Sequence, residues 1–413
     1  MSASVEVKNE ALESSGAPLS SYRWVIAAGM VMSNWAMVIP ALSFGILLPE
    51  IRKTFPMSDT QAGWLSSSVR IGNIVLILSS VFIFAKLNPL KLFSATVLAG
   101  AVLTFVMASA ANFWIFAVAR FAFGASASAR TPARPLLTQQ WFPLREIPKV
   151  QGLVFGLSGL AEFLALSMTP FLLSATGSWR VVLYVYGGVG SIIFIAWAFS
   201  AKERITPDYI EKSKAPKNFS IGSVWRYKDL WYLGLGAFGV GFGWFVFSTF
   251  WPTYMHDTHG IPLKRSGAII GTVSLAQMPA GLVMGVIAAK VRDRRPILVA
   301  CGLGMAGALI GLTLVTQTWA LVLLCLLGGF SWCFMPIILS IPYEIPGIDL
   351  SNVSAGLALV TTIHLTGGII GPIAAGGISD GTGSLFIALV VSACLPVALS
   401  LLCLRVRPYQ RAA

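Results

Sequence analysis

The sequence predicts an all-α integral membrane protein with twelve transmembrane helices in two pseudo-symmetric six-helix bundles. Three observations lead to this prediction. Hydrophobic residues make up 56% of the 413 residues and charged residues only 11%, whereas soluble domains carry about 25% charged residues. The apolar residues form twelve long runs. The second half of the chain also repeats features of the first half at a nearly constant spacing.

Each of the twelve runs is long enough to cross a bilayer, which takes about 20 predominantly apolar residues. In chain order they cover residues 24–48, 60–84, 90–110, 113–137, 150–174, 180–200, 231–253, 266–288, 297–316, 319–342, 353–378 and 384–404. The longest polar gap separates six runs from six. We therefore expect an N-terminal tail, a first bundle, a central loop, a second bundle and a C-terminal tail at 1–22, 23–200, 201–230, 231–404 and 405–413.

The distribution of basic residues predicts the orientation. If both termini are cytoplasmic, the tails and inner loops hold 20 of the 29 Lys and Arg residues and the outer loops hold 5. Cytoplasmic loops of membrane proteins are rich in these residues. We expect a multi-pass protein of the inner (plasma) membrane with cytoplasmic tails and loop, and a monomer. The net charge of +13 then reflects loop topology, and no nucleic-acid partner is expected.

An internal repeat links the two predicted bundles. Ala62-Gly63 matches Ser266-Gly267, and Gln151–Leu153 matches Ala355–Leu357, each at a separation of 204 positions. Such self-similarity indicates a duplicated unit. Parallel repeats in a transporter place the substrate site between the halves, near the middle of the bilayer.

Four stretches resemble a known family, the major facilitator superfamily of secondary transporters. They are "ARFAFG" (119–124), "QQWFPLRE" (139–146), "GSWRVVLYVYG" (177–187) and "GVIAAKVRDRRP" (285–296). The second and third resemble its anion-transporting branches: anion:cation symporters, nitrate–cyanate carriers and carboxylate carriers. The resemblance implies the twelve-helix fold of the superfamily, alternating access, and a structural and coupling role for Arg120. The last stretch departs from the family pattern at Ala289, where the family has Asp, and at Arg292, where it has Gly.

Four arginines lie within the predicted spans. A charge near the centre of a span costs about 2.5–3.5 kcal/mol and almost always faces a cavity or a partner. Arginine suits bidentate recognition of oxyanions, so Arg70 and Arg130 are predicted to bind substrate; the alternative for Arg70 is a structural ion pair with an acidic residue. Arg134 is expected to reach the cytoplasmic interface. Pro132 and Pro135 predict a bend near it.

Two other titratable groups lie in mid-span. Glu162 is predicted to be a proton carrier or, alternatively, to neutralise Arg120 or Arg130. His364 is predicted to contact the cavity and could titrate near neutral pH; the alternative is a histidine whose polar atoms are satisfied in the core. The neutral candidates for contact with substrate are Asn34, Trp35, Asn73, Trp244, Gln277 and Trp332. Asn73 and Gln277 are related by the same 204-residue spacing.

The predicted function is secondary active transport of a small organic anion, such as a carboxylate, coupled to protons or to another gradient. The reason is the surplus of arginine over acidic groups in mid-span, which attracts anions. The alternatives are an inorganic anion of nitrate or cyanate type, or efflux of an amphipathic compound. The sequence has no P-loop, no H-E-x-x-H and no Cys/His set with metal spacing, so we expect no enzyme activity, no cofactor and no metal.

Overall fold

A computed structural model describes residues 21–83, 88–128, 130–142, 146–202, 224–291, 293–345 and 350–407. Throughout these ranges the chain is organised as α-helices, with short 3-10 turns at Val224–Arg226 (η1) and Ile341–Glu344 (η2). The predicted tails and central loop lie largely outside the described residues.

The helices up to residue 200 form the N-terminal half. They are α2 (Arg23–Thr54), α3 (Asp59–Ile83), α4 (Pro89–Ala108), α5 (Phe113–Ser128), α6 (Arg130–Trp141), α7 (Ile147–Thr176) and α8 (Trp179–Ser200).

The helices from residue 228 onward form the C-terminal half. They are α10 (Lys228–His259), α11 (Leu263–Lys290), α12 (Arg295–Leu314), α13 (Thr318–Ser331), α14 (Phe334–Ser340), α15 (Leu350–Thr382), α16 (Leu385–Cys394) and α17 (Val397–Cys403).

Each predicted apolar run falls on one helix or on two consecutive helices. Among the described residues, nine helical segments are long and apolar enough to cross a membrane, and α5 is a shorter apolar helix. Helix α6 continues through Pro132 and Pro135, where a bend was predicted. Residue 129, between α5 and α6, lies outside the described residues.

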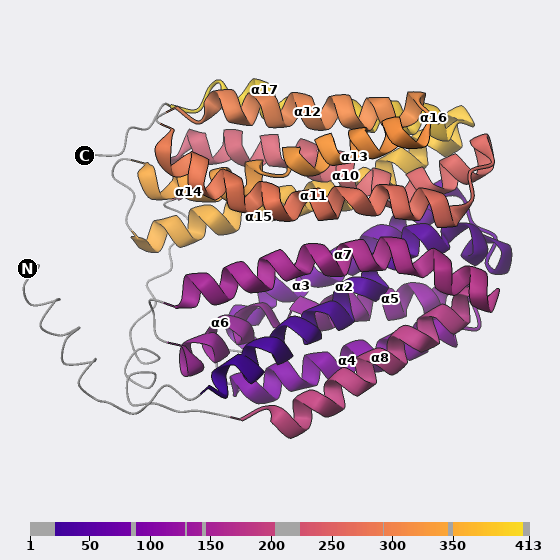
Figure 1. Cartoon of the computed structure of the whole chain (residues 1–413), viewed down its shortest axis with the longest axis horizontal. Coiled ribbons are helices and arrows are strands. Elements are labelled where there is room, and N and C mark those ends of the chain that lie inside the picture. The colour runs from indigo at the N-terminus through magenta and orange to yellow at the C-terminus, as the bar shows by residue number, and fades with distance from the viewer. Residues whose placement is uncertain are drawn as a thin grey trace, which may run out of the picture.

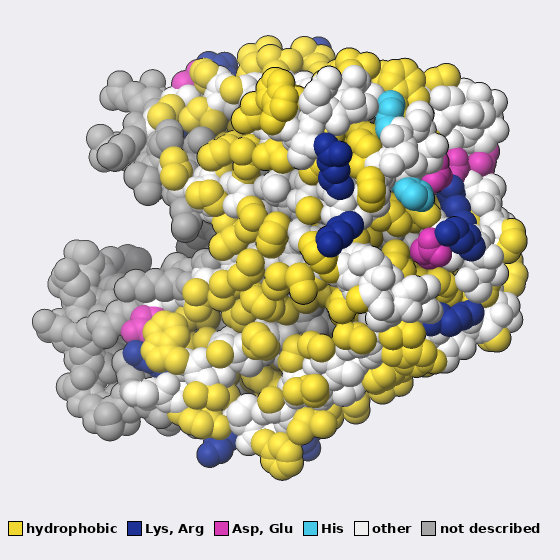
Figure 2. Space-filling model, turned by 45° about the vertical axis from the view of Figure 1, so that its right-hand side comes forward, with side chains coloured by type: hydrophobic (Ala, Val, Ile, Leu, Met, Phe, Trp, Pro, Cys, Tyr) yellow, Lys and Arg dark blue, Asp and Glu magenta, His cyan; other side chains and the backbone are white. Residues whose placement is uncertain are grey.

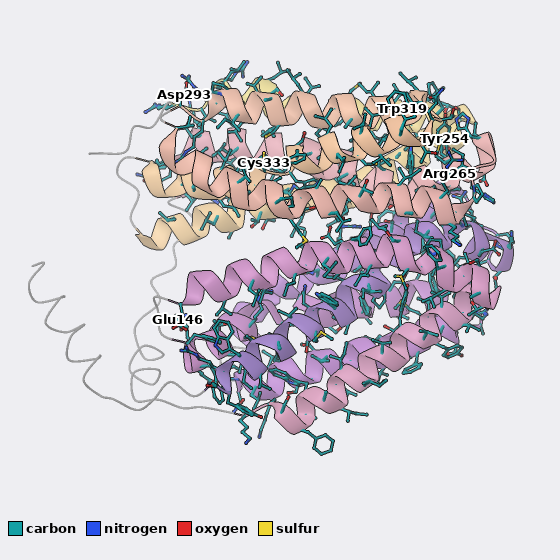
Figure 3. The ribbon with its side chains drawn as sticks, in the orientation of Figure 1. Glu146, Tyr254, Arg265, Asp293, Trp319 and Cys333 are labelled. Atoms are coloured by element: carbon teal, nitrogen blue, oxygen red, sulfur yellow. The ribbon has the colours of Figure 1, made fainter. Side chains whose placement is uncertain are left out.

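The two halves lie side by side, with their helices running along the long axis of the molecule (Figure 1). The start of α2 and the end of α17 lie at the same end of the bundle, which we call the terminal end; we call the opposite end the distal end. Glu146 and Asp293 mark the terminal end, Tyr254, Arg265 and Trp319 mark the distal end, and Cys333 lies between them (Figure 3). In Figure 1 the ribbons of α7 and α15 diverge toward the terminal end.

Contacts between the halves occur where α3 packs against α15, α7 against α11, and α2 against α10. The hydroxyl groups of Ser66 and Thr249 are 2.7 Å apart, and the Ser67 hydroxyl donates to the carbonyl oxygen of Ile369 at 2.6 Å. Further toward the distal end, a Cβ added to Gly376 would lie 2.2 Å from the carbonyl oxygen of Asp59. Backbone touches backbone here, so the halves are closed against each other on the distal side.

The first turn of α3 receives part of its cap from the other half. Its own capping box joins Ser58 and Gln61. The backbone N–H of Gln61 donates to the Ser58 hydroxyl, and the backbone N–H of Ser58 donates to the side-chain oxygen of Gln61. The carboxylate of Asp380, on α15, accepts from the amides of Asp59 and Thr60, both at 2.9 Å. We call this contact the Asp380 cap. A carboxylate at a helix N-terminus also complements the helix dipole.

Charged side chains gather toward the ends, and hydrophobic side chains cover most of the middle of the face that Figure 2 shows. At the terminal end Arg23 forms an ion pair with Glu146 at 3.0 Å. At the start of α12 the Arg295 guanidinium donates to both carboxylate oxygens of Asp293. This hydrogen bonding holds the pKa of Asp293 below its usual range.

Candidate functional site

Arg70 lies where the two halves join, on the terminal side of the Ser66 and Ser67 contacts. Its Nη1 donates to the carbonyl oxygen of Ser66, one turn earlier in α3, at 3.0 Å. Its Cζ lies 3.6 Å from the centroid of Phe245 on α10, so the guanidinium stacks on a ring of the other half. Within the described residues Arg70 has no ion pair, and the alternative of a structural acidic partner finds no support there.

An aromatic cluster of the C-terminal half surrounds this stack. The centroid of His364 lies 5.9 Å from that of Trp332, 6.3 Å from that of Phe334 and 6.4 Å from that of Phe245. Trp332 in turn lies edge-on to Trp244 at 6.1 Å. We call this group the central cluster; its members are Arg70, Trp244, Phe245, Trp332, Phe334 and His364.

A helix break positions Trp332. Helix α13 ends at Ser331 and α14 begins at Phe334, so Trp332 and Cys333 form a turn between them. Figure 3 shows Cys333 between the two ends of the bundle. The Nε1 of Trp332 is buried and has no hydrogen-bond partner among the described residues. A buried unsatisfied donor costs about 1–3 kcal/mol, and such costs are commonly tolerated at functional sites.

Arg120 and Arg130 are buried inside the N-terminal half. Arg120 is 3% exposed; its Nε donates to the carbonyl oxygen of Leu65 at 2.9 Å, and its Cζ lies 4.1 Å from the Phe44 ring. Arg130 is 7% exposed and donates to the carbonyl oxygen of Ser33 at 2.7 Å. Each guanidinium joins helices of one half. Arg134 is partly buried, and its Nε has no hydrogen-bond partner among the described residues.

Glu162 lies between the halves, away from these arginines. Its carboxylate accepts a hydrogen bond from the Ser274 hydroxyl on α11 at 3.2 Å. It forms no ion pair with Arg120 or Arg130, although that pairing was one of the two interpretations of the sequence. The reason is topological. Helix α7 packs mainly against α11 and α2 rather than against the helices that precede and follow it in the chain.

The remaining candidates divide into two groups. The Asn34 amide donates to the Ser158 hydroxyl at 2.8 Å and the Trp35 indole to the carbonyl oxygen of Leu157 at 2.9 Å, which fastens α2 to α7. Asn73 lies one turn after Arg70 on α3, and Gln277 one turn after Ser274 on α11; both are partly buried.

Sequence reasoning did not select Phe245 or Ser274. The 204-residue spacing relates Arg70 to Ser274, so the repeat could have identified Ser274 as a counterpart position. Phe245 carries no such signal, because its role depends on how the two halves meet.

The family follows from comparison with known proteins. The sequence profile of the Major Facilitator Superfamily matches residues 24–356. The chain belongs to this superfamily. It is therefore a multi-pass membrane transporter rather than an enzyme, as the sequence motifs and the all-helical fold predicted.

Similar proteins include several transporters with anionic substrates in their names. The chain is 22% identical to a probable sulfoacetate transporter of Cupriavidus necator, covering 90% of this chain and 91% of that protein. It is 24% identical to the hexuronate transporter of Bacillus subtilis, covering 89% and 90%.

Solved structures agree on the fold. A bacterial homologue of the lysosomal transporter Spinster, in an inward-facing and unoccupied conformation, has a TM-score of 0.71 at 14% identity, covering 94% of this chain and 95% of that chain. The nucleoside transporter NupG has a TM-score of 0.75 at 12% identity, covering 93% and 99%.

Proposed function

We propose that this transporter moves a small organic anion, in the class of carboxylates and sulfonates, across the inner (plasma) membrane together with protons. The observation that carries the proposal is Arg70, which has no ion pair among the described residues and faces the other half at mid-depth. A guanidinium in this setting offers paired donors to an oxyanion. The names of the sulfoacetate and hexuronate relatives support the same substrate class.

With both termini in the cytoplasm, the distal end is the outer end. The contacts of Ser66, Ser67 and Asp380 then close the outer side beyond Arg70, which corresponds to an inward-facing state. Alternating access would open these contacts and close the terminal end. This assignment of state depends on the proposed orientation, which the loop charges support.

The aromatic members of the central cluster bear on the substrate. Phe245 and Trp332, which are partly exposed, offer ring surfaces and few hydrogen-bonding groups, whereas recognition of a sugar needs more polar partners. We therefore place a small anion with few hydroxyl groups ahead of a sugar acid within the proposed class.

A thermal-shift screen of the purified protein tests the proposal. The panel contains sulfoacetate, glucuronate, nitrate, cyanate, a neutral hexose and a lipophilic cation. A ligand at 100 times its Kd stabilises the native state by about 2.7 kcal/mol. We expect organic anions to raise the Tm. A shift by nitrate or cyanate alone would favour the inorganic-anion alternative, and a shift by the cation alone would favour efflux.

Arg70→Ala is expected to weaken binding of the stabilising anion. Hydrogen bonds to charged groups contribute about 1.5–3 kcal/mol, so the loss in affinity is roughly 10- to 150-fold. Arg70→Lys keeps the charge but loses the bidentate geometry, so its affinity for the anion should lie between those of the wild type and Arg70→Ala. Arg405→Ala, at the exposed terminal end, controls for loss of net charge. Wild-type affinity in Arg70→Ala would remove Arg70 from the site.

A further inference from the structure

We propose that His364 carries the coupled proton and takes it up together with the anion that Arg70 binds. This inference rests on the proposed function and names the residue that links the anion to the proton. It is drawn from the hydrogen bond that fixes the imidazole, from the position of Arg70, and from the Trp332 indole, which has no hydrogen-bond partner among the described residues.

One hydrogen bond fixes the tautomer of His364. Its Nδ1 lies 2.9 Å from the carbonyl oxygen of Ala237 on α10. A carbonyl oxygen can only accept, so Nδ1 carries a hydrogen in both the neutral and the charged ring. Nε2 is therefore the nitrogen that gains and loses the proton. When neutral it is an acceptor that disfavours an anion, and when protonated it is a charged donor that favours one.

The packing around the imidazole leaves little freedom to rotate. His364 is 5% exposed. A Cβ at Gly241 would lie 3.0 Å from its Nδ1 and Cε1, so the ring occupies the space that a side chain on α10 would fill. Trp332 and Phe334 cover it from the α13–α14 turn and α14. The ring thus keeps Nδ1 on the Ala237 carbonyl while Nε2 changes its protonation state.

Arg70, on α3, is the charged neighbour of this ring. Its guanidinium stacks on Phe245, and Phe245 contacts His364, so Arg70 and His364 are separated by no more than these two ring distances together. The described charged and titratable groups of α10 and α15 lie toward the helix ends, at Lys228, Asp229, Tyr232, Tyr254, His256, Asp257, His259 and Asp380, and α14 has none. On the α13–α14 turn the titratable neighbour is the Cys333 thiol.

Two positive charges at this separation repel each other unless an anion lies close to both. An anion on Arg70 therefore favours the protonated ring, and a protonated ring favours the anion. This coupling is reciprocal by thermodynamic necessity. The Trp332 indole, next to His364 and unpaired within the described chain, supplies a third donor for an oxyanion.

Glu162 is the competing carrier. It lies on α7 and is bound to Ser274 of α11, whereas the central cluster is built from α3, α10, the α13–α14 turn, α14 and α15. Within the described part of the chain, no hydrogen bond or ion pair joins Glu162 to that cluster. Its hydrogen bond spans the two halves, and this position suits a contact that holds the halves together.

Titration calorimetry in two buffers of different ionisation enthalpy counts the protons taken up per anion bound. The probes are sulfoacetate and glucuronate, between about pH 5.5 and 8.5, a range centred near the ordinary pKa of histidine. We expect the wild-type protein to take up a proton with the anion. Its affinity should then fall about tenfold per pH unit on the alkaline side of this range, as linkage requires for one proton.

His364→Asn is the decisive variant. The asparagine amide can still donate to the Ala237 carbonyl, which preserves the packing, but it cannot titrate. We expect no proton uptake and an affinity that no longer changes with pH. His364→Gln serves as a second variant if the first does not purify as folded protein. His259→Asn, at the distal end, is the matched control and should keep the wild-type proton uptake.

Every other outcome refutes either His364 as the proton carrier or the proposed function. Unchanged proton uptake in His364→Asn, or a wild-type affinity that is flat with pH, refutes His364 as the carrier and leaves anion transport standing. Loss of uptake in Glu162→Gln alone assigns the proton to Glu162 instead. If neither probe binds and the wider anion panel also fails to shift the wild-type Tm, the proposed function itself fails.

Discussion

Gly376→Leu is expected to give a folded protein that transports about 5- to 150-fold more slowly than the wild type. In this structure a Cβ at Gly376 would lie 2.2 Å from the carbonyl oxygen of Asp59, 2.5 Å from its carbonyl carbon and 2.7 Å from the Cα of Thr60. All three atoms belong to the backbone of α3, so no side chain can move aside. Because α3 belongs to the other half, the clash is relieved when the halves separate at the distal end.

The variant should therefore remain in a state with the distal end open. Overpacking costs typically about 1–3 kcal/mol, and a bias of that size shifts an equilibrium between two states by about 5- to 150-fold. Gly63 makes the same kind of contact from α3, since a Cβ added there would lie 2.2 Å from the carbonyl oxygen of Pro372. A transport cycle that cannot close its distal end cannot deliver substrate to the terminal side.

Two measurements check this expectation. The rate of uptake of the stabilising anion into proteoliposomes should fall by about 5- to 150-fold, which is the shift in the equilibrium between the two states. Thr249→Cys, which replaces a side chain that is 2% exposed in the closed contact, should react faster with a polar maleimide in the Gly376→Leu background. The matched control is Gly377→Leu, since a Cβ there meets only the Thr60 hydroxyl at 3.9 Å. Normal transport by Gly376→Leu would show that α3 and α15 tolerate the added side chain.

Gly124→Leu is expected to abolish folding of the N-terminal half. A Cβ at Gly124 would lie 1.8 Å from the carbonyl oxygen of Val69 and 2.6 Å from its Cα. Gly72 makes the reciprocal contact: a Cβ added there would lie 2.2 Å from the carbonyl oxygen of Phe121. Small residues let transmembrane helices approach this closely. Helices α5 and α3 belong to the same half, so separation of the halves gives no relief.

The destabilisation should reach or exceed the upper end of the usual overpacking range, about 3 kcal/mol. The Arg120 hydrogen bond to the Leu65 carbonyl crosses the same α5–α3 contact and would be lost with it. The measurement is the yield of monodisperse protein in size-exclusion chromatography, together with its Tm. Gly188→Leu is the control, because a Cβ there has nothing within 4 Å. A Gly124→Leu variant with wild-type yield and Tm would contradict the packing described here.

The sequence predicted the helices well because hydropathy marks the apolar core of each span. It placed their ends less well: α10 continues to His259, beyond the apolar run that ends at 253, since hydropathy does not register polar turns that extend a helix. Pro132 and Pro135 lie inside α6, which runs from Arg130 to Trp141, and the bend expected there stays a prediction.

The sequence could predict which residues belong to the candidate site, but not how they are arranged in space. Arg70 and His364 stand out because charge and imidazole are rare in apolar helices. Their connection through Phe245 depends on the meeting of two halves that are far apart in the chain. For Glu162, chain order suggested a partner on the preceding span, whereas the structure gives it Ser274 from the other half. Contacts across a duplicated fold follow the packing of the halves, which local patterns do not encode.

The Asp380 cap has a consequence for observing the protein without labels. Two backbone amides, those of Asp59 and Thr60, have their acceptor only while the halves are together at the distal end; the Gln61 amide is held by its own half in either state. The rate of deuterium uptake at the Asp59 and Thr60 amides, with the Gln61 amide as an internal reference, therefore reports the fraction of molecules that are closed at the distal end. The amides in the first turn of α3 thus report the conformational state of the transporter.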